Sequence, residues 1–243
     1  MQKVKKIFSF IPKRLPHTSF DSIKELPEAV FFDYDGTISD NERYLIPAFE
    51  YAIKKNLDKK TRKEIAKINY DADKWKYIKE HFSTEIFAKC NEDYGKYIVN
   101  QTFYSIRGVR TFIYNLKKMR IKMYVVSQKD GNGLREEMKK TGIIKHFNGI
   151  FGTLDLGTLQ KPSKEFMDKV KEITKTTNKN CWMIGDRCSD VVSAINLDAK
   201  AFIINKVEYQ KIVNNYGNLI GTQIFFTTYK RLLKLLLKLK KIK

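Results

Sequence analysis

The segment AVFFDYDGT, residues 29–37, joins an apolar run to two aspartates, a glycine and a threonine. The four apolar residues predict a buried strand that ends in a turn. Because side chains alternate along a strand, Asp33 and Asp35 project to the same side. Gly36 lets the backbone turn and approach a ligand closely. Ligands of open α/β sheets bind beyond the carboxyl ends of the strands, so the segment predicts a site for a metal ion and a phosphate group.

Three later segments carry polar residues of the same kind. Ser127 follows a β-branched apolar run, and Lys161 opens a helical pattern after a loop that contains glycines. The sequence Gly185-Asp186-Arg187-Cys188-Ser189-Asp190 follows the apolar run at 181–184. Any one of these acids alone is also explained by a helix cap or a surface acid. The order of acid, hydroxyl, lysine and paired acids is hard to explain by unrelated turns, and it indicates one site.

These four segments resemble the motifs of the haloacid dehalogenase-like hydrolase superfamily. The resemblance spans about residues 28–232 and is nearest to the phosphoglycolate-phosphatase-like branch, whose members carry a helical cap after the first motif. Two positions differ from that branch: Asp40-Asn41-Glu42 stands where Asp-Ser-Glu is frequent, and Arg187 stands where serine is frequent. Neither difference removes a catalytic group, but both leave the subfamily open.

The residues suit phosphoryl transfer. A phosphate monoester is dianionic, so a divalent cation and a fixed lysine would neutralise charge in the transition state. Asp33 is the expected nucleophile, which forms an aspartyl-phosphate. Asp35 is the expected acid and base, which protonates the leaving alcohol and then activates water. Ser127 would donate a hydrogen bond to a phosphoryl oxygen, and Lys161 would supply positive charge to the phosphoryl group and to Asp33.

Mg²⁺ is the expected cofactor, because hard oxygen ligands suit it and it commonly shares a substrate phosphate. The resemblance implies ligation by Asp33, by the backbone carbonyl of Asp35 and by Asp186. Asp190 is expected to contact the metal ligands without binding the metal itself, or to orient Lys161. A helix cap stays open as an alternative for Asp190.

The whole pattern predicts an α/β fold, a Rossmann-like parallel sheet flanked by helices, with an inserted α-helical cap. Residues 1–27 form a basic lead-in, residues 28–37 and 106–243 the core, and residues 38–105 the cap. Alternating helices and strands indicate a parallel sheet wrapped by helices. Strands are expected at 29–34, 121–127, 149–152, 181–185, 200–205 and 223–226, and core helices at 108–119, 132–141, 163–174, 189–196 and 229–239.

The net charge of +20 is concentrated at the two ends of the chain. Residues 1–16 carry five basic residues, residues 230–243 carry seven, and neither range contains an acid. A basic surface attracts nucleic acid or anionic lipid without specificity. We favour a lysine-rich bias on solvated faces and expect no specific nucleic-acid partner. The leucine stripe of the C-terminal helix also suits a membrane surface, but packing on the sheet is favoured over peripheral membrane contact.

The length of the apolar runs and the number of cysteines limit the possible cellular compartments of the protein. No apolar run reaches the ~18 residues that a membrane-spanning helix needs. Three scattered cysteines, Cys90, Cys181 and Cys188, indicate reduced thiols and a cytoplasmic location.

From the motifs, we expect a Mg²⁺-dependent phosphatase that acts on a small phosphorylated metabolite. A phosphomutase acting on a sugar phosphate and a non-catalytic binding or scaffold protein with a lapsed site are the alternatives. The identity of the ester and the oligomeric state do not follow from the sequence.

Overall fold

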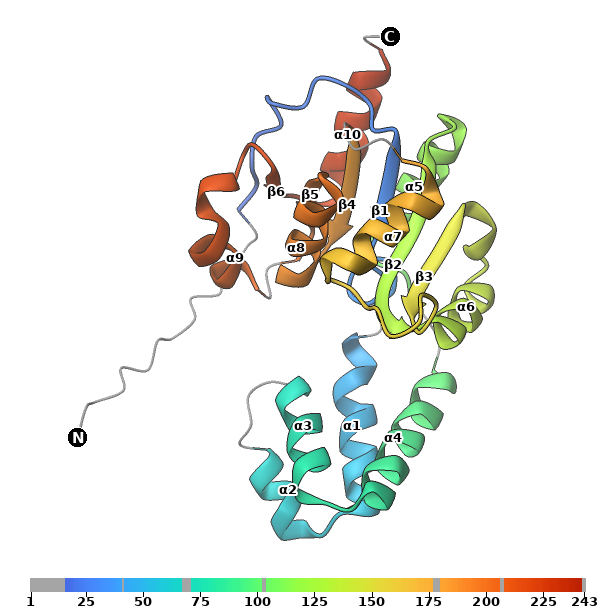
Figure 1. Ribbon diagram of the computed structural model, residues 1–243, viewed down its shortest axis with the longest axis vertical. Coiled ribbons are helices and arrows are strands. Elements are labelled where there is room, and N and C mark those ends of the chain that lie inside the picture. The colour runs from blue at the N-terminus through green and yellow to red at the C-terminus, as the bar shows by residue number, and fades with distance from the viewer. Residues whose placement is uncertain are drawn as a thin grey trace, which may run out of the picture. The chain divides into compact units, whose positions relative to one another are not determined.

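The computed structural model describes residues 16–40, 42–66, 71–101, 104–176, 180–205 and 208–241. The chain divides into two compact units. One comprises Met1–Asp40 with Ser105–Lys243, and the other comprises Asn41–Tyr104 (Figure 1). The predicted lead-in at 1–27 falls partly outside the described residues.

The first unit is built on a parallel sheet. Its described strands are β1 (Ala29–Phe32), β2 (Lys122–Asp130), β3 (Gly149–Thr153), β4 (Cys181–Gly185), β5 (Lys200–Ile203) and β6 (Ile224–Phe226). They are hydrogen-bonded in the order β3-β2-β1-β4-β5-β6. The central strand β1 pairs with β2 on one side and with β4 on the other. The polar segments at 33–37 and 186–190 follow β1 and β4 directly, and Ser127 lies in the C-terminal half of β2, so the topology brings these segments to one edge of the sheet.

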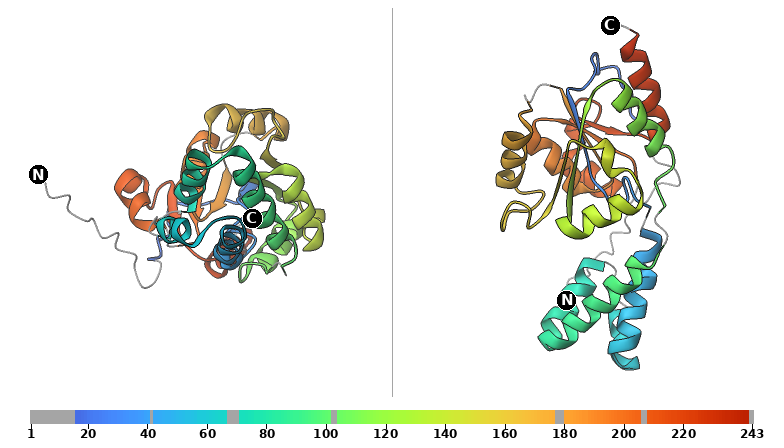
Figure 2. Two further views of the ribbon diagram at one scale, coloured as in Figure 1. Left: turned by 90° about the horizontal axis from the view of Figure 1, so that it is seen from below. Right: turned by 90° about the vertical axis from the view of Figure 1, so that its right-hand side faces the viewer.

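Helices cover both faces of the sheet (Figure 2). Helices α5 (Val109–Lys118), α6 (Gly131–Lys140) and α10 (Tyr229–Lys240) contribute buried residues to one apolar cluster. Helices α7 (Lys164–Thr174), α8 (Cys188–Leu197) and α9 (Tyr209–Tyr216) contribute to the cluster on the opposite face. The leucine stripe of α10 lies in the first cluster, because Leu232, Leu235, Leu236 and Leu239 are buried there. The predicted Rossmann-like α/β core is therefore confirmed.

Strand β1 shows why its sequence is apolar without interruption. Val30 and Phe32 belong to the cluster on one face, and Ala29 and Phe31 belong to the cluster on the other. All four side chains are fully buried. A parallel strand that is covered on both faces has no solvent side, so it lacks the alternation of an exposed sheet. This burial fixes β1 at the centre of the fold and with it the position of the segment that follows.

The second unit is helical in its described residues. It contains α1 (Glu42–Asn56), α2 (Lys59–Ile65), α3 (Asp71–His81) and α4 (Thr84–Val99). Asp58 caps α2 and Ser83 caps α4 through their side-chain oxygens. The unit has an apolar core of its own, in which the rings of Phe49 and Trp75 meet edge to face at 5.1 Å.

Several predicted boundaries are wrong. Strand β2 continues to Asp130, three residues beyond its predicted end. Lys161 does not open a helix: α7 begins at Lys164 and is capped by Ser163, so Lys161 lies in the preceding loop. Helix α9 was not predicted.

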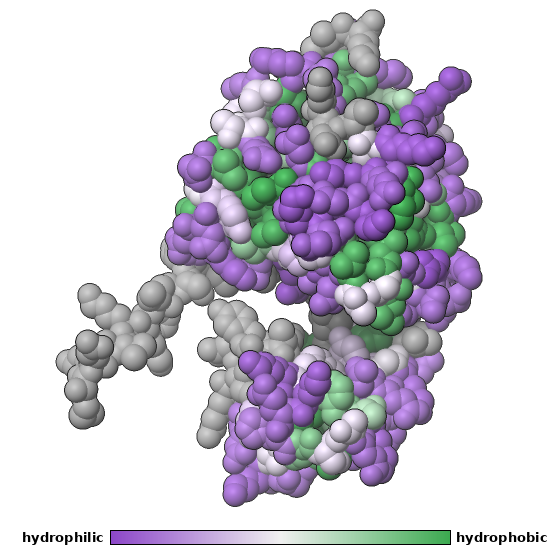
Figure 3. Space-filling view, in the orientation of Figure 1, coloured by the Kyte–Doolittle hydropathy of each residue, from purple (hydrophilic) through white to green (hydrophobic). Residues whose placement is uncertain are grey.

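The surface carries most of the charge of the chain. Hydrophilic residues cover much of the face of the sheet-containing unit that is displayed in Figure 3. Among the side chains that the structure describes, Lys161 is the single buried lysine. None of the helices in the described ranges combines the length and the apolar character that crossing a membrane requires.

Candidate active site

Asp33 and Lys161 form the centre of the candidate site. Asp33 directly follows β1, and its backbone N–H donates to the carbonyl of Ile184 on β4 at 2.8 Å. The Nζ atom of Lys161 donates to Oδ1 of Asp33 at 2.7 Å and to the carbonyl of Val126 at 3.3 Å. The same ammonium forms an ion pair with Asp190. Lys161 therefore joins the ends of β1 and β2 to the first turn of α8.

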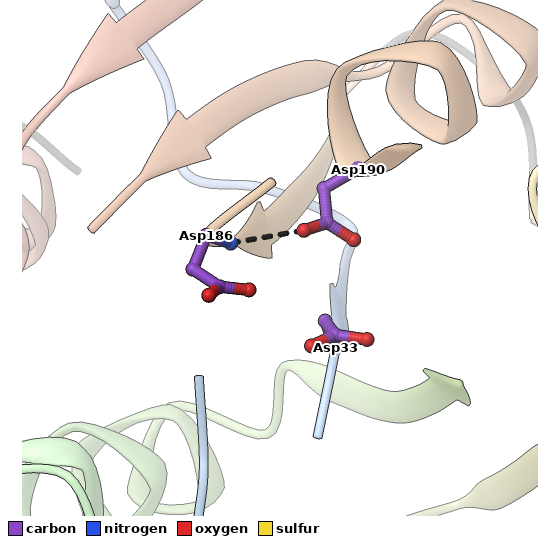
Figure 4. A group of neighbouring side chains, drawn as sticks. All are labelled: Asp33, Asp186 and Asp190. Carbon is purple, nitrogen blue, oxygen red and sulfur yellow. Dashed lines mark hydrogen bonds between the residues drawn. The ribbon is translucent and has the colours of Figure 1, made fainter. Parts of the chain in front are cut away.

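Asp190 organises the loop between β4 and α8. Its Oδ2 atom accepts a hydrogen bond from the backbone N–H of Asp186 at 2.9 Å (Figure 4) and another from the backbone N–H of Arg187, also at 2.9 Å. Its Oδ1 atom is the one that pairs with Lys161. A side chain at Gly185 would overlap the Asp190 carboxylate, so the strand must end in glycine for Asp190 to approach. Because both carboxylate oxygens are engaged, Asp190 is suited to holding Lys161 and the loop in place.

Three carboxylates converge beside Lys161. One oxygen each from Asp33, Asp186 and Asp190 lies within 4.8 Å of the others, and Figure 4 shows the three groups facing a common space. When all three carboxylates are ionised, they exceed the one buried ammonium by two negative charges. The Nε atom of Arg187 lies 3.8 Å from Asp186, but its side chain is about half exposed. Hard oxygen donors and this excess of negative charge fit a divalent cation such as Mg²⁺.

Burial and charge act against each other at the central pair. Burial raises the pKa of Asp33 to about 7, and the adjacent Lys161 ammonium opposes that rise. Burial alone would lower the pKa of Lys161, but the charges of Asp190 and Asp33 hold it above its ordinary value. Lys161 is therefore a permanent positive charge beside Asp33. A further cation beside Asp33 would favour the ionised, nucleophilic carboxylate.

Ser127 lies within β2, next to the residue whose carbonyl binds Lys161. The residue is 2% exposed, and its Oγ atom accepts a hydrogen bond from the N–H of Lys129 at 3.1 Å. This contact uses an acceptor site of the hydroxyl and leaves its proton available for another acceptor. The hydroxyl is thereby prepared to donate to an oxygen of a bound phosphoryl group.

Asp35 has a different neighbour. The Nζ atom of Lys129 lies 3.3 Å from Oδ1 of Asp35 and 2.6 Å from Oε1 of Glu137. Neither Lys129 nor Glu137 was singled out from the sequence. Two signals were available: Lys129 stands two residues after Ser127, and Glu137 stands between two buried apolar residues of α6.

Comparisons with known proteins place the chain in a family. The family model described as haloacid dehalogenase-like hydrolase matches residues 30–204. A PpaX protein of Caldanaerobacter subterraneus, for which pyrophosphatase activity is proposed, is 29% identical over 169 residues, which are 68% of this chain and 76% of that protein.

Solved structures show the same fold. A predicted phosphoglycolate phosphatase from Haemophilus somnus superimposes with a TM-score of 0.66 at 16% identity over 86% of this chain and 97% of its own. CbbY from Rhodobacter sphaeroides, solved in complex with xylulose-1,5-bisphosphate, gives a TM-score of 0.59 at 14% identity over 74% of this chain and 87% of its own.

The family model covers more than half of the chain and includes the segments around Asp33, Ser127, Lys161 and Asp190. The predicted family is thereby confirmed, as is the predicted enzyme class, a hydrolase related to phosphatases. The chain belongs to the haloacid dehalogenase-like hydrolase family.

Proposed function

We propose that the protein is a Mg²⁺-dependent phosphatase that hydrolyses a small phosphorylated metabolite through an aspartyl-phosphate on Asp33. The observation that supports this proposal most directly is the buried Lys161, which contacts Asp33 at 2.7 Å and pairs with Asp190 beside a group of three carboxylates. A buried cation next to an acid that follows a central strand is suited to receiving a dianionic group. The cytoplasm is the proposed location.

In the first step, Lys161 holds one oxygen of Asp33 and the other oxygen attacks the phosphorus atom. The bond between phosphorus and the ester oxygen breaks, and Asp35 gives its proton to the departing alkoxide. Ser127 and Lys161 stabilise the charge on the phosphoryl oxygens. Mg²⁺, held by Asp33, Asp186 and the backbone carbonyl of Asp35, would supply neutralisation of the phosphoryl charge.

In the second step, a water molecule attacks the phosphorus of the aspartyl-phosphate, and Asp35 takes a proton from that water. The bond between phosphorus and the Asp33 oxygen breaks, so inorganic phosphate leaves and the Asp33 carboxylate is restored. The same group thus acts first as acid and then as base. Lys161 keeps its position throughout because Asp190 holds it from the other side.

The helical insert at 38–105 is the proposed cap that selects the substrate. The polar residues proposed for chemistry all lie outside it and supply only phosphoryl transfer. The name of the PpaX relative adds inorganic pyrophosphate to the candidate substrates, and the CbbY complex adds sugar bisphosphates. We propose a small phosphate-bearing molecule as the partner of the site.

A product analysis tests the reaction type. The purified chain is incubated with Mg²⁺ and a panel of sugar phosphates, phosphoglycolate, nucleotides and pyrophosphate. We expect inorganic phosphate to appear in step with the loss of one substrate, with pyrophosphate yielding two phosphates. An isomerised sugar phosphate with little free phosphate would identify a phosphomutase instead. An absence of turnover on the whole panel would favour a binding protein with a lapsed site.

Metal binding has an expected effect on stability. Saturating Mg²⁺ should raise the free energy of unfolding, by ~2.7 kcal/mol at a hundredfold excess over the dissociation constant. Asp186→Asn should abolish this increase. Without Mg²⁺ this variant should be at least as stable as the wild type, because one of the buried, mutually repelling carboxylates is removed.

Thermal melts with and without Mg²⁺ measure this effect. Asp168→Asn is the matched control, since Asp168 is partly exposed on α7 and pairs only with nearby lysines there among the contacts described. The control should keep the full Mg²⁺ response. An undiminished response in Asp186→Asn would remove Asp186 from the metal site.

A further inference from the structure

Lys129 lies between two carboxylates at the edge of the candidate site. Its ammonium is 2.6 Å from Glu137 and 3.3 Å from Asp35, and it lies 5.5 Å from the centre of the Tyr34 ring. The side chain is 22% exposed, whereas that of Glu137 is 8% exposed. Lys129 is therefore held on three sides by groups that attract a cation.

The local backbone aims Lys129 at this position. The ladder between β2 and β3 changes register between Val126 and Asp130, the stretch that contains Ser127 and Lys129. Such irregularities re-aim side chains and are frequent beside active sites. Ser127 accepts the N–H of Lys129, so the phosphate-binding hydroxyl and the lysine are placed by one piece of backbone.

The turn from β2 into α6 fixes the distance between Lys129 and Glu137. A side chain at Gly131 would overlap the carboxylate of Asp155. Asp155 is held by Arg135 through two hydrogen bonds of 2.9 and 2.6 Å, and it accepts the N–H of Gly152 at 2.7 Å. This bidentate contact between α6 and the loop after β3 restrains the helix that carries Glu137.

Stability does not explain the pair of Lys129 and Glu137. Within the described part of the chain, Glu137 and the Tyr34 side chain are both buried; burial, and after it the charge of Glu137, raises the pKa of Tyr34. Burial raises the pKa of Glu137, and Lys129 opposes that rise. A buried ion pair is weak evidence for a stabilising role, because desolvation offsets its attraction. The second contact of Lys129, at Asp35, therefore offers an explanation that stability alone does not.

We propose that Lys129 is a positioning residue, which holds the carboxylate of Asp35 in place for proton transfer, and that Glu137 anchors Lys129 from α6. The inference rests on the proposed role of Asp35 as acid and base. Asp35 is 35% exposed at its side chain, so burial alone does not fix the rotamer of its carboxylate. Lys129 restricts that freedom. The negative charge of Glu137 largely balances the positive charge of Lys129. Lys129 therefore holds Asp35 by direct contact without adding much net positive charge beside it.

The experiment compares two classes of ester. An alkyl phosphate has a poor leaving group and needs the proton from Asp35, whereas p-nitrophenyl phosphate departs without one. We expect Lys129→Met to lower kcat/KM for the alkyl ester by ~10- to 100-fold and for the aryl ester by less than ~3-fold. The ratio of the two kcat/KM values is the readout, because it reports the step in which the leaving group departs.

Two further variants distinguish positioning from a general loss of structure. Lys129→Arg keeps the cation and should restore most of the lost ratio. The double variant Lys129→Met/Glu137→Gln removes the buried, unpaired acid and should fold while showing the same ratio as Lys129→Met. Lys139→Met is the control, since Lys139 is exposed on α6 and pairs with Glu136 there. The control should match the wild type.

A second measurement does not depend on turnover. The effects of Asp35→Asn and Lys129→Met on the free energy of urea unfolding should be non-additive, because each removes the same contact. Additive effects would overturn the inference even in a chain that hydrolysed no ester, whereas inactivity alone would count only against the proposed function. Equal losses on both esters, or a rise in KM without a change in the ratio, would also overturn it.

Discussion

Asp33→Asn is expected to lower turnover by at least about a thousandfold while the protein stays folded. An amide oxygen does not form the acyl-phosphate that the proposed mechanism requires. Asparagine has nearly the same shape as aspartate, and Lys161 keeps its pair with Asp190 in the variant. Phosphate release on the ester found in the substrate screen measures the activity, and circular dichroism measures the fold.

Trapping the intermediate makes the test of the nucleophile specific. Acid quenching of the wild type during turnover of a radiolabelled ester should leave label on the protein, and the variant should carry none. Mass spectrometry must show that the asparagine has not reverted by deamidation. Wild-type-like turnover in an intact variant would transfer the role of nucleophile to another residue.

Lys161→Met is expected to cause the largest loss of stability, a decrease of ~3–5 kcal/mol in the free energy of unfolding. Lys161 is the single buried lysine among the side chains that the structure describes. Its removal leaves Asp33, Asp186 and Asp190 close together with no buried cation to compensate them. Urea denaturation in the absence of Mg²⁺ gives the value directly.

Two companion variants complete this test. Lys164 lies three residues after Lys161, is exposed and pairs with Asp168 at the surface. Lys164→Met should therefore change the free energy of unfolding by less than ~1 kcal/mol. Adding Asp190→Asn to Lys161→Met should restore part of the loss, because one of the uncompensated charges is removed. A small effect of Lys161→Met, comparable with that of Lys164→Met, would refute the view that this lysine balances the buried acids.

The core of the fold could be predicted because its physical signals are local. Strands β1 and β4 are short apolar runs that end in polar loops, and their predicted positions agree with the structure to within two residues. The end of β2 could not be predicted in this way. Gln128, Lys129 and Asp130 are polar, and they extend the strand because Asp130 pairs with Thr153 across the change of register. Such an extension depends on a tertiary contact, which no local pattern contains.

The candidate site likewise contains residues that the sequence could predict and residues that it could not. Asp33, Lys161, Asp186 and Asp190 follow one another in a recognisable order, and parallel topology brings the ends of their strands together. The contact between Lys129 and Glu137 depends instead on how α6 is angled against β2. That angle is set by Arg135, Asp155 and close glycine contacts, so it could not be derived from spacing alone. Which residues of the helical insert would touch a substrate also lies beyond the sequence pattern.

The central place of β1 has a consequence for the chain as it leaves the ribosome. Strand β1 is translated long before its two neighbours, which begin at Lys122 and Cys181. At ~5–20 residues per second, the four apolar residues of β1 wait roughly eight to thirty seconds before β4 is available. The helical insert is translated in the meantime and has its own core to collapse on. During translation, one edge of β1 therefore stays unpaired until β4 has emerged, and the set of site residues is complete only once Asp190 has been added.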